Sequence, residues 1–289
     1  MRVLVLGITG MLGSAMLRIL TASEKLEVYG TARHAGACGY FPEIKPDRII
    51  APVDVENSDF LVKAFASAKP DVVINCIGVV KQLAEAKNPL YAVPLNTMLP
   101  HRLSNLCEIV GARLIHISTD CVFSGAQGNY RETDFPDADD LYGRSKLLGE
   151  VDYPHAVTLR TSIIGHELSG QRSLLNWFLA QNDSVKGFTR AIFSGLPTIE
   201  LSRIVRDYVL IRPELHGLYH VAAKPINKFD LLSLIAEIYG KDIAIIPDKD
   251  FVIDRSLNAD RFHQATGYTA RDWPELIASM FASFQAHKG

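Results

Sequence analysis

Tyr142 and Lys146 are four residues apart, which places both side chains on one face if the segment is a helix. A tyrosine hydroxyl has a pKa of about 10 and exchanges protons poorly at neutral pH unless its anion is stabilised. A nearby ammonium lowers that pKa and can also donate a hydrogen bond to a cofactor ribose. The pair predicts proton transfer by Tyr142 supported by Lys146, although a surface helix can contain the same spacing by chance.

A threonine upstream of this pair adds a second hydroxyl. Thr119 lies in the triplet Ser118-Thr119-Asp120, which directly follows a predicted strand over 113–117. The carboxyl ends of parallel strands form the edge at which open α/β sheets bind ligands. We therefore expect Thr119 to donate a hydrogen bond to a substrate carbonyl and to share in proton transfer with Tyr142.

A glycine-rich turn near the N-terminus joins an apolar run over 3–6 to a predicted helix over 11–20. Glycines allow a tight turn and close approach of a pyrophosphate, and the free N–H groups of the following helix point at it. The spacing is GxxGxxG, whereas the usual fingerprint is GxGxxG. We predict that the turn binds a dinucleotide through Gly7, Thr9, Gly10, Met11, Leu12 and Gly13.

Two further positions indicate which dinucleotide is bound. The second predicted strand (28–32) is followed by Arg33, whereas an NAD site usually carries an acidic residue near this point for the ribose 2′-hydroxyl. A guanidinium suits a 2′-phosphate, because it is always charged and can donate to two oxygens. Asp54 and Val55, after the third predicted strand, are expected beside the adenine. The sequence favours NADPH.

The elements that must position these residues alternate in the first half of the chain. Strand-like runs and amphipathic helical patterns predict a doubly wound parallel sheet of the Rossmann type with a smaller interleaved α/β lobe. We expect a cofactor domain over 1–165, a return of about 198–222 to it, and a substrate lobe over 166–289. The predicted strands cover 3–6, 28–32, 48–53, 72–76, 113–117 and 156–160, and the predicted helices 11–20, 59–68, 97–110, 174–181, 199–210, 228–239 and 273–286.

The composition excludes several classes of protein. The chain has 289 residues, is 48% hydrophobic and carries 30 basic against 32 acidic residues, which argues against disorder and against binding nucleic acid or a membrane surface. The four cysteines form no CxxC pair and no metal-ligand spacing with the histidines, so we expect free thiols, no metal and a cytoplasmic location.

With these motifs in this order, the sequence resembles the extended short-chain dehydrogenase/reductases, and among them the dTDP-4-dehydrorhamnose reductases. The resemblance runs in order through both halves of the chain. It is carried by ISTDCVF (117–123), YGRSKLLGE (142–150), LRTS (159–162), GLPT (195–198), GLYHV (217–221) and LNADRF (257–262).

The resemblance implies a role for each matching residue. Tyr142 would donate the proton, Lys146 would lower its pKa and hold the nicotinamide ribose, and Thr119 would orient the ketone. The segment Cys76, Ile77 and Gly78 would line the cofactor. The implied reaction is hydride transfer from NADPH to C4 of a nucleotide-activated 4-keto-6-deoxy sugar, as in the synthesis of surface polysaccharides, with the cofactor supplying the hydride.

Departures from the family pattern fall on the expected substrate side. Cys121 replaces the usual tyrosine after Ser-Thr-Asp, and Arg255 stands at a position that is usually serine. Lys81 and Arg255 are the leading candidates to bind the substrate diphosphate, with Cys121 beside the sugar. These differences leave the nucleotide base and the sugar open, so that a UDP-linked N-acetylated 6-deoxy sugar is an alternative to a dTDP-linked one.

Two other functions stay open on the same fold. A sugar-nucleotide 4-epimerase would retain NAD through turnover, and Arg33 argues against it. A non-catalytic NADP-binding regulatory subunit would not need Thr119, Tyr142 and Lys146 together. The expected partner is a nucleotide-diphosphate sugar, and self-association into a homodimer is left open.

Overall fold

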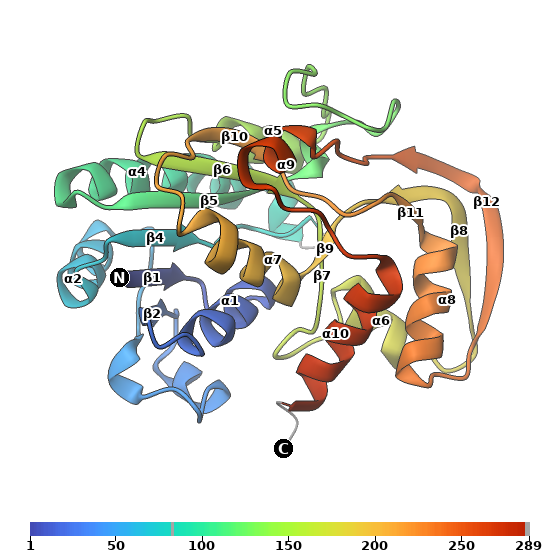
Figure 1. Cartoon of the computed structure of the whole chain (residues 1–289), viewed down its shortest axis with the longest axis horizontal. Helices are drawn as coiled ribbons and strands as arrows, with labels where there is room; N and C mark the ends of the chain where they lie inside the picture. The colour runs from blue at the N-terminus through green and yellow to red at the C-terminus, as the bar shows by residue number, and fades with distance from the viewer. Residues whose placement is uncertain (82–83, 287–289) are drawn as a thin grey trace.

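The computed structural model describes residues 1–81 and 84–286, and its centre is a seven-stranded parallel sheet (Figure 1). The strand order is β10-β6-β5-β4-β1-β2-β3, so the chain starts in the middle and winds outward in both directions. This confirms the predicted fold class. The strands are β1 (Arg2–Leu6), β2 (Glu27–Thr31), β3 (Ile49–Ile50), β4 (Val72–Asn75), β5 (Arg113–Thr119), β6 (Ala156–Thr161) and β10 (Gly217–His220).

Side chains on the central strands alternate between two apolar cores, one on each face of the sheet. In β1, Val3 and Val5 belong to one core, whereas Leu4 and Leu6 belong to the other. All four are fully buried, as expected for a strand covered by helices on both faces. This double burial is why the strands appear in the sequence as continuous apolar runs.

Helices cover both faces of this sheet (Figure 1). On one face lie α1 and α7, which pack against each other, and on the other lie α2 and α4. The helices are α1 (Met11–Thr21), α2 (Ser58–Ala68), α3 (Pro89–Ala92), α4 (Leu99–Val110), α5 (Leu141–Leu148), α6 (Leu174–Ala180), α7 (Thr198–Ile204), α8 (Lys228–Tyr239), α9 (Asp260–Thr266) and α10 (Trp273–Ala286), with π-helical turns at Val93–Met98 and Val205–Val209.

A smaller sheet lies at one end of the molecule, where α8 packs against it (Figure 1). Its order is β11-β8-β12, with β8 (Ser184–Phe193) parallel to β12 (Ala244–Asp254) and antiparallel to β11 (Ile226–Asn227). A further pair joins β7 (Ile163–Ile164) to β9 (Leu196–Pro197). Between these segments the chain returns to the central sheet, because β10 pairs with β6.

Several parts of the fold differ from the sequence-based expectation, among them β10, which is absent from the predicted strands. The third central strand spans only Ile49–Ile50, because Pro52 has no backbone N–H for a longer ladder. The strands β8 and β12 were not expected. The edge strand β12 leaves Ile246, Phe251 and Val252 about half exposed, so it lacks the apolar alternation of a half-buried strand.

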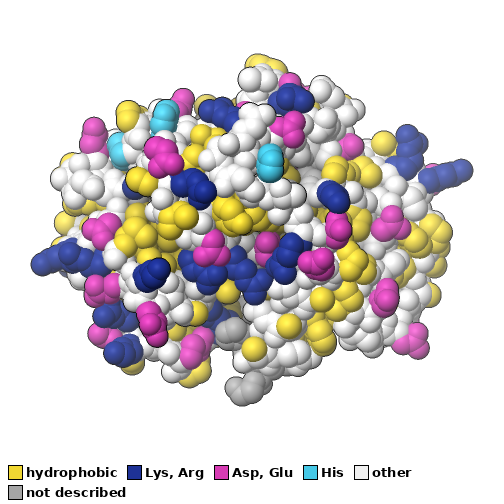
Figure 2. Space-filling view, in the orientation of Figure 1, with side chains coloured by type: hydrophobic (Ala, Val, Ile, Leu, Met, Phe, Trp, Pro, Cys, Tyr) yellow, Lys and Arg dark blue, Asp and Glu magenta, His cyan; other side chains and the backbone are white. Residues whose placement is uncertain are grey.

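The surface agrees with the balanced charge of the chain. On the face shown in Figure 2, Lys and Arg side chains lie interleaved with Asp and Glu side chains. In the part of the chain that the structure describes, no helix is both long and apolar enough to cross a membrane.

Candidate active site

The glycine turn forms a compact cradle between β1 and α1. Gly7 has φ +83°, and a Cβ added at Gly13 would lie 2.1 Å from the Gly7 carbonyl oxygen. The turn is closed by a hydrogen bond of 3.0 Å from the Gly10 nitrogen to the same oxygen. Any side chain at Gly13 would therefore separate α1 from the turn that precedes it.

The N-terminus of α1 faces this cradle without a side chain to cap it. Gly10 is the N-cap residue, and both Thr9 and Gly10 are exposed. No acidic residue lies in the first turn of α1. The free N–H groups and the positive end of the helix dipole are thus available to a pyrophosphate. The residues Gly7, Thr9, Gly10, Met11, Leu12 and Gly13 fit a dinucleotide.

The adenosine end of the predicted cofactor site lies at the carboxyl end of β2. Arg33 is exposed two residues beyond β2, and Asp54 is exposed on the turn that follows β3. One Asp54 oxygen accepts a hydrogen bond of 3.0 Å from the Glu56 nitrogen, and Val55 is buried. The positions are compatible with a ribose 2′-phosphate and an adenine, and their roles stay predictions.

The segment after β4 connects the cofactor side to the catalytic residues. The Cys76 nitrogen donates to the Leu6 carbonyl at 3.2 Å, and burial raises the pKa of the Cys76 thiol to about 12. A Cβ on Gly78 would lie 3.8 Å from the Lys146 nitrogen. Cys76, Ile77 and Gly78 therefore lie between the glycine turn and Lys146.

Tyr142 and Thr119 are brought together by a close approach of α5 to the loop after β5. A Cβ at Gly143 would lie 2.3 Å from the Cys121 carbonyl oxygen, so only glycine permits this packing. Asp140 caps α5 by accepting a hydrogen bond of 2.7 Å from the Gly143 nitrogen. Burial raises the pKa of Tyr142, while hydrogen bonding by the Thr119 hydroxyl lowers it.

Lys146 lies one turn further along α5 and is 5% exposed. Its ammonium donates a hydrogen bond of 2.8 Å to the Ile117 carbonyl oxygen at the end of β5. Burial lowers the pKa of Lys146 to about 8, and the Glu150 carboxylate opposes that shift. The structure therefore places Thr119, Tyr142 and Lys146 at one edge of the sheet, next to the glycine turn.

A buried ion pair between Arg160 and Glu150 lies next to this edge of the sheet. The Arg160 guanidinium on β6 donates twice to Glu150, each time at 2.6 Å, and the Ser118 hydroxyl donates to the same carboxylate at 2.6 Å. Arg160 also lies 3.3 Å from a ring nitrogen of His220 on β10. Four of the sequence segments that carry the resemblance therefore meet in one network.

Asn96 is a site residue that the sequence analysis missed. It is fully buried in the π-helical turn before α4, where it accepts from the Val79 nitrogen at 2.9 Å and donates to the Ser145 hydroxyl at 3.1 Å. A Cβ at Gly149 would lie 1.9 Å from the Asn96 carbonyl oxygen. Asn96 thus fixes α5 to the segment after β4. The sequence signal was a lone asparagine inside a helical stretch.

The predicted substrate residues Cys121, Arg255 and Lys81 lie around the loop after β5 and the start of α5. The Arg255 guanidinium donates to the Phe123 carbonyl at 2.7 Å and lies 4.0 Å from the Cys121 sulfur. Lys81 forms an ion pair of 2.5 Å with Asp140. Burial raises the pKa of the Cys121 thiol to about 12, which makes it a poor nucleophile.

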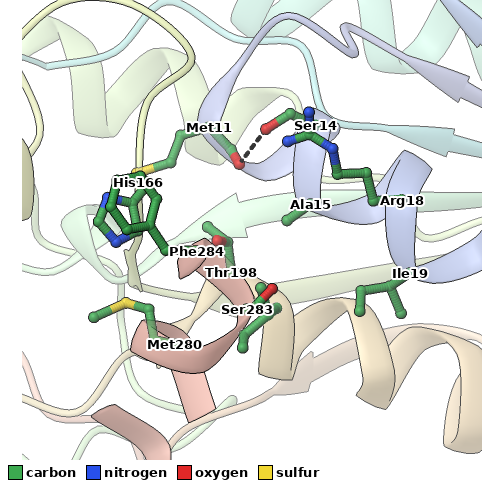
Figure 3. A pocket seen from close by; sticks show the side chains of 11 residues that line it. Met11, Ser14, Ala15, Arg18, Ile19, His166, Thr198, Met280, Ser283 and Phe284 are labelled. Carbon is green, nitrogen blue, oxygen red and sulfur yellow. Dashed lines mark hydrogen bonds between the residues drawn. The ribbon is translucent and has the colours of Figure 1, made fainter. Parts of the chain in front are cut away.

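A separate cavity lies between α1, α7 and α10 (Figure 3). His166 stacks on Phe284 along it, with ring centroids 3.7 Å apart, and the Ser14 hydroxyl donates to the Met11 carbonyl at 3.1 Å. Thr119, Tyr142 and Lys146 do not line this cavity. Within residues 1–81 and 84–286, no cluster of three or more His, Cys, Asp or Glu side chains could hold a metal ion.

Comparison with known proteins agrees with this arrangement. Residues 1–285 match the family model described as RmlD substrate binding domain. The chain is 30% identical over 256 residues to the probable low-salt glycan biosynthesis reductase Agl14 of Haloferax volcanii, covering 84% of this chain and 81% of that protein.

Two further similarities extend this comparison. The crystal structure of dTDP-4-dehydrorhamnose reductase from Bacillus anthracis in complex with NADP has a TM-score of 0.80 at 20% identity, and 98% of each chain is covered. Methionine adenosyltransferase 2 subunit beta of Bos taurus is 32% identical over 149 residues, which cover 52% of this chain and 41% of that protein.

Proposed function

Because the chain belongs to the family of the RmlD substrate binding domain, we propose that it is an NADPH-dependent reductase of a nucleotide-activated 4-keto-6-deoxy sugar. The resemblance to dTDP-4-dehydrorhamnose reductases, expected from the motifs, is confirmed at the level of family and fold. The observation that carries the proposal is the grouping of Tyr142, Thr119 and Lys146 beside the glycine turn.

In this proposal Tyr142 is the proton donor. Burial keeps its phenol protonated at neutral pH, which is the state that an acid needs before a ketone is reduced. The Thr119 hydroxyl would donate to the same ketone oxygen and then to the phenolate that Tyr142 becomes. Nicotinamide supplies the hydride to C4 when it is bound.

Lys146 would hold the cofactor and assist Tyr142. Its ammonium already lies at the carboxyl end of β5, near Gly78, where a nicotinamide ribose would pass. In this proposal its positive charge would favour the phenolate over the phenol and so would oppose the effect of burial on the pKa of Tyr142. Proton donation thereby becomes easier once the site is filled.

The remaining residues would bind the other parts of the cofactor. Arg33 would bind the ribose 2′-phosphate, Asp54 and Val55 the adenine, and the glycine turn the pyrophosphate. The likeness to a reductase crystallised with NADP supports NADPH over NADH. We propose that residues 1–165 and about 198–222 bind the cofactor, and that the rest of 166–289 binds the sugar nucleotide.

The test is NADPH oxidation with dTDP- and UDP-linked 4-keto-6-deoxy sugars, including the N-acetylated UDP sugar. We expect one nucleotide to support oxidation, with NADPH preferred over NADH. Tyr142→Phe should abolish turnover while leaving NADPH affinity nearly unchanged. Tyr153→Phe is the matched control, because Tyr153 bonds to His101 at the surface, away from the site. Wild-type turnover in Tyr142→Phe would refute its assignment as the proton donor.

A second candidate is a subunit that binds NADP and acts on a partner enzyme, favoured by the similarity to methionine adenosyltransferase 2 subunit beta. NADPH binding without oxidation of any of these sugars would support it. Retention of a bound NAD through turnover would support the 4-epimerase. The cytoplasmic location and the homodimer stay predictions.

A further inference from the structure

Lys228 is a cationic residue of the site that the reaction proposed above does not use. It is the first residue of α8, and it is half-buried. The ammonium lies 4.1 Å from the centroid of the Phe193 ring on β8. Its charge acts on Asp120 and Cys121, which directly follow Thr119 in the chain. Ile192 of β8 pairs with both Asn227 and Asp254, so Lys228 and Arg255 each lie one residue from the same point of the smaller sheet.

This ammonium has no polar partner in the part of the chain that the structure describes. Across residues 1–81 and 84–286, no carboxylate lies within 4.0 Å of the Lys228 nitrogen and no hydrogen bond from it is formed. The neighbouring cations differ, since Lys81 is paired with Asp140 and Arg255 donates to the Phe123 carbonyl. An ammonium has three donors, and an aromatic ring occupies only one side of it.

The loop after β5 is surrounded by charges of both signs. Lys228 and Arg255 both act on Asp120, whereas Lys81 is already neutralised by Asp140. Asp120 is buried beside Thr119, and burial raises the pKa of its carboxyl. Arg255 also acts on Asp137 and Asp140, whereas the carboxyl that acts on Lys228 is Asp120, whose charged form is disfavoured by burial. A ligand with one or more negative charges would compensate the charge of Lys228.

We propose that Lys228 is a substrate-binding residue which, together with Arg255, binds the diphosphate of the sugar nucleotide. The inference rests on the proposed function, because that function supplies a ligand whose diphosphate is attached across the sugar ring from the ketone. Thr119 and Tyr142 would hold the ketone oxygen, and Lys228 would fix the opposite end of the ring. Lys81, which sequence reasoning favoured for this task, would instead support the cap of α5 through Asp140.

The test compares ligand affinity in Lys228→Met, Lys228→Arg and wild type by calorimetry, with dTDP and UDP as probes and NADP present. Charge-assisted hydrogen bonds of this kind correspond to about 10- to 100-fold in affinity. We expect Lys228→Met to lower the affinity for the nucleoside diphosphate by at least about 10-fold. Lys228→Arg should retain most of the wild-type affinity. The matched control is Lys224→Met, since Lys224 is a surface lysine paired with Asp272.

Titrations with thymidine and uridine, which lack the diphosphate, distinguish binding of the diphosphate from binding of the base. If Lys228 binds the diphosphate, Lys228→Met leaves the affinity for the nucleosides and for NADPH unchanged. Equal dTDP or UDP affinity in wild type and Lys228→Met would overturn the inference, and so would an equal loss of nucleoside or NADPH affinity. If the wild type binds NADPH but neither dTDP nor UDP, the proposed function itself fails and the inference falls with it.

Discussion

Replacing Gly143 by alanine tests how α5 delivers Tyr142 to Thr119. The added Cβ would lie 2.3 Å from the Cys121 carbonyl oxygen and 2.6 Å from the Ala138 Cβ. Neither atom is the end of a flexible side chain, so the helix itself must move. Ordinary contact begins at 3.4 Å, so α5 has to withdraw by about 1 Å from the loop that directly follows Thr119.

The expected effect on turnover is larger than the effect on stability. A displacement of about 1 Å between reacting groups can reduce a rate by about 100-fold. Overpacking destabilises a fold by about 1–3 kcal/mol, and the better helix propensity of alanine offsets about 1 kcal/mol of that. We therefore expect Gly143→Ala to lose about 100-fold in kcat, with a loss of at most about 2 kcal/mol in the free energy of unfolding.

The assay is steady-state turnover on the sugar nucleotide that the wild type reduces, together with urea unfolding and NADPH binding. Gly39→Ala is the matched control, because a Cβ at Gly39 meets no atom within 4 Å. A Gly143→Ala protein that folds and keeps kcat within about threefold of wild type would refute the close-approach argument. A large loss of NADPH affinity would also contradict it, because the change should act on Tyr142 and not on the glycine turn.

Other perturbations test the cofactor end and the support of the site. In fluorescence titrations, Arg33→Ala should lower the affinity for NADPH by about 10-fold or more and leave the affinity for NADH unchanged, because only the contact with the 2′-phosphate is lost. Equal effects on both affinities would show that Arg33 does not bind the 2′-phosphate. Arg160→Met leaves the Glu150 carboxylate buried without its partner and should cost about 3–5 kcal/mol in urea unfolding, whereas less than 1 kcal/mol would contradict the network. The folded-state pKa of Lys146 is lowered to about 8 from the ordinary 10.5, so the unfolded chain binds more protons between these values. The unfolding free energy of the wild type should therefore rise from pH 8 to pH 10 relative to Lys146→Met, by on the order of 2–3 kcal/mol, and a flat difference would refute the shift.

The parts of the fold that were predictable are those in which local pattern and tertiary packing agree. The strands of the central sheet are buried on both faces, so their apolar runs are visible in the sequence. The turn from Gly7 to Gly13 and the spacing from Tyr142 to Lys146 are also local features. Local spacing sufficed to find these residues, because each lies at the end of a predicted strand or on one helix.

What was missed depends on contacts between distant segments. Strands β8 and β12 pair mainly with each other and leave one side exposed, so neither carries a strong apolar pattern. Asn96 acquires its place from Val79 and Ser145, on other elements. Lys228 resembles any solvated lysine at the start of a helix, and the tertiary fold brings its ammonium to the Phe193 ring of β8.

The central claim is that a hydride passes from the cofactor to C4 of a sugar nucleotide while Tyr142 supplies the proton. Its most direct test uses NADPH deuterated at the transferred position, with mass spectrometry and NMR of the sugar product. We predict one deuterium at C4 for each NADPH consumed, and none with Tyr142→Phe. Product without deuterium and without net NADPH oxidation, or NADPH binding with no product from any of the 4-keto-6-deoxy sugars, would contradict it.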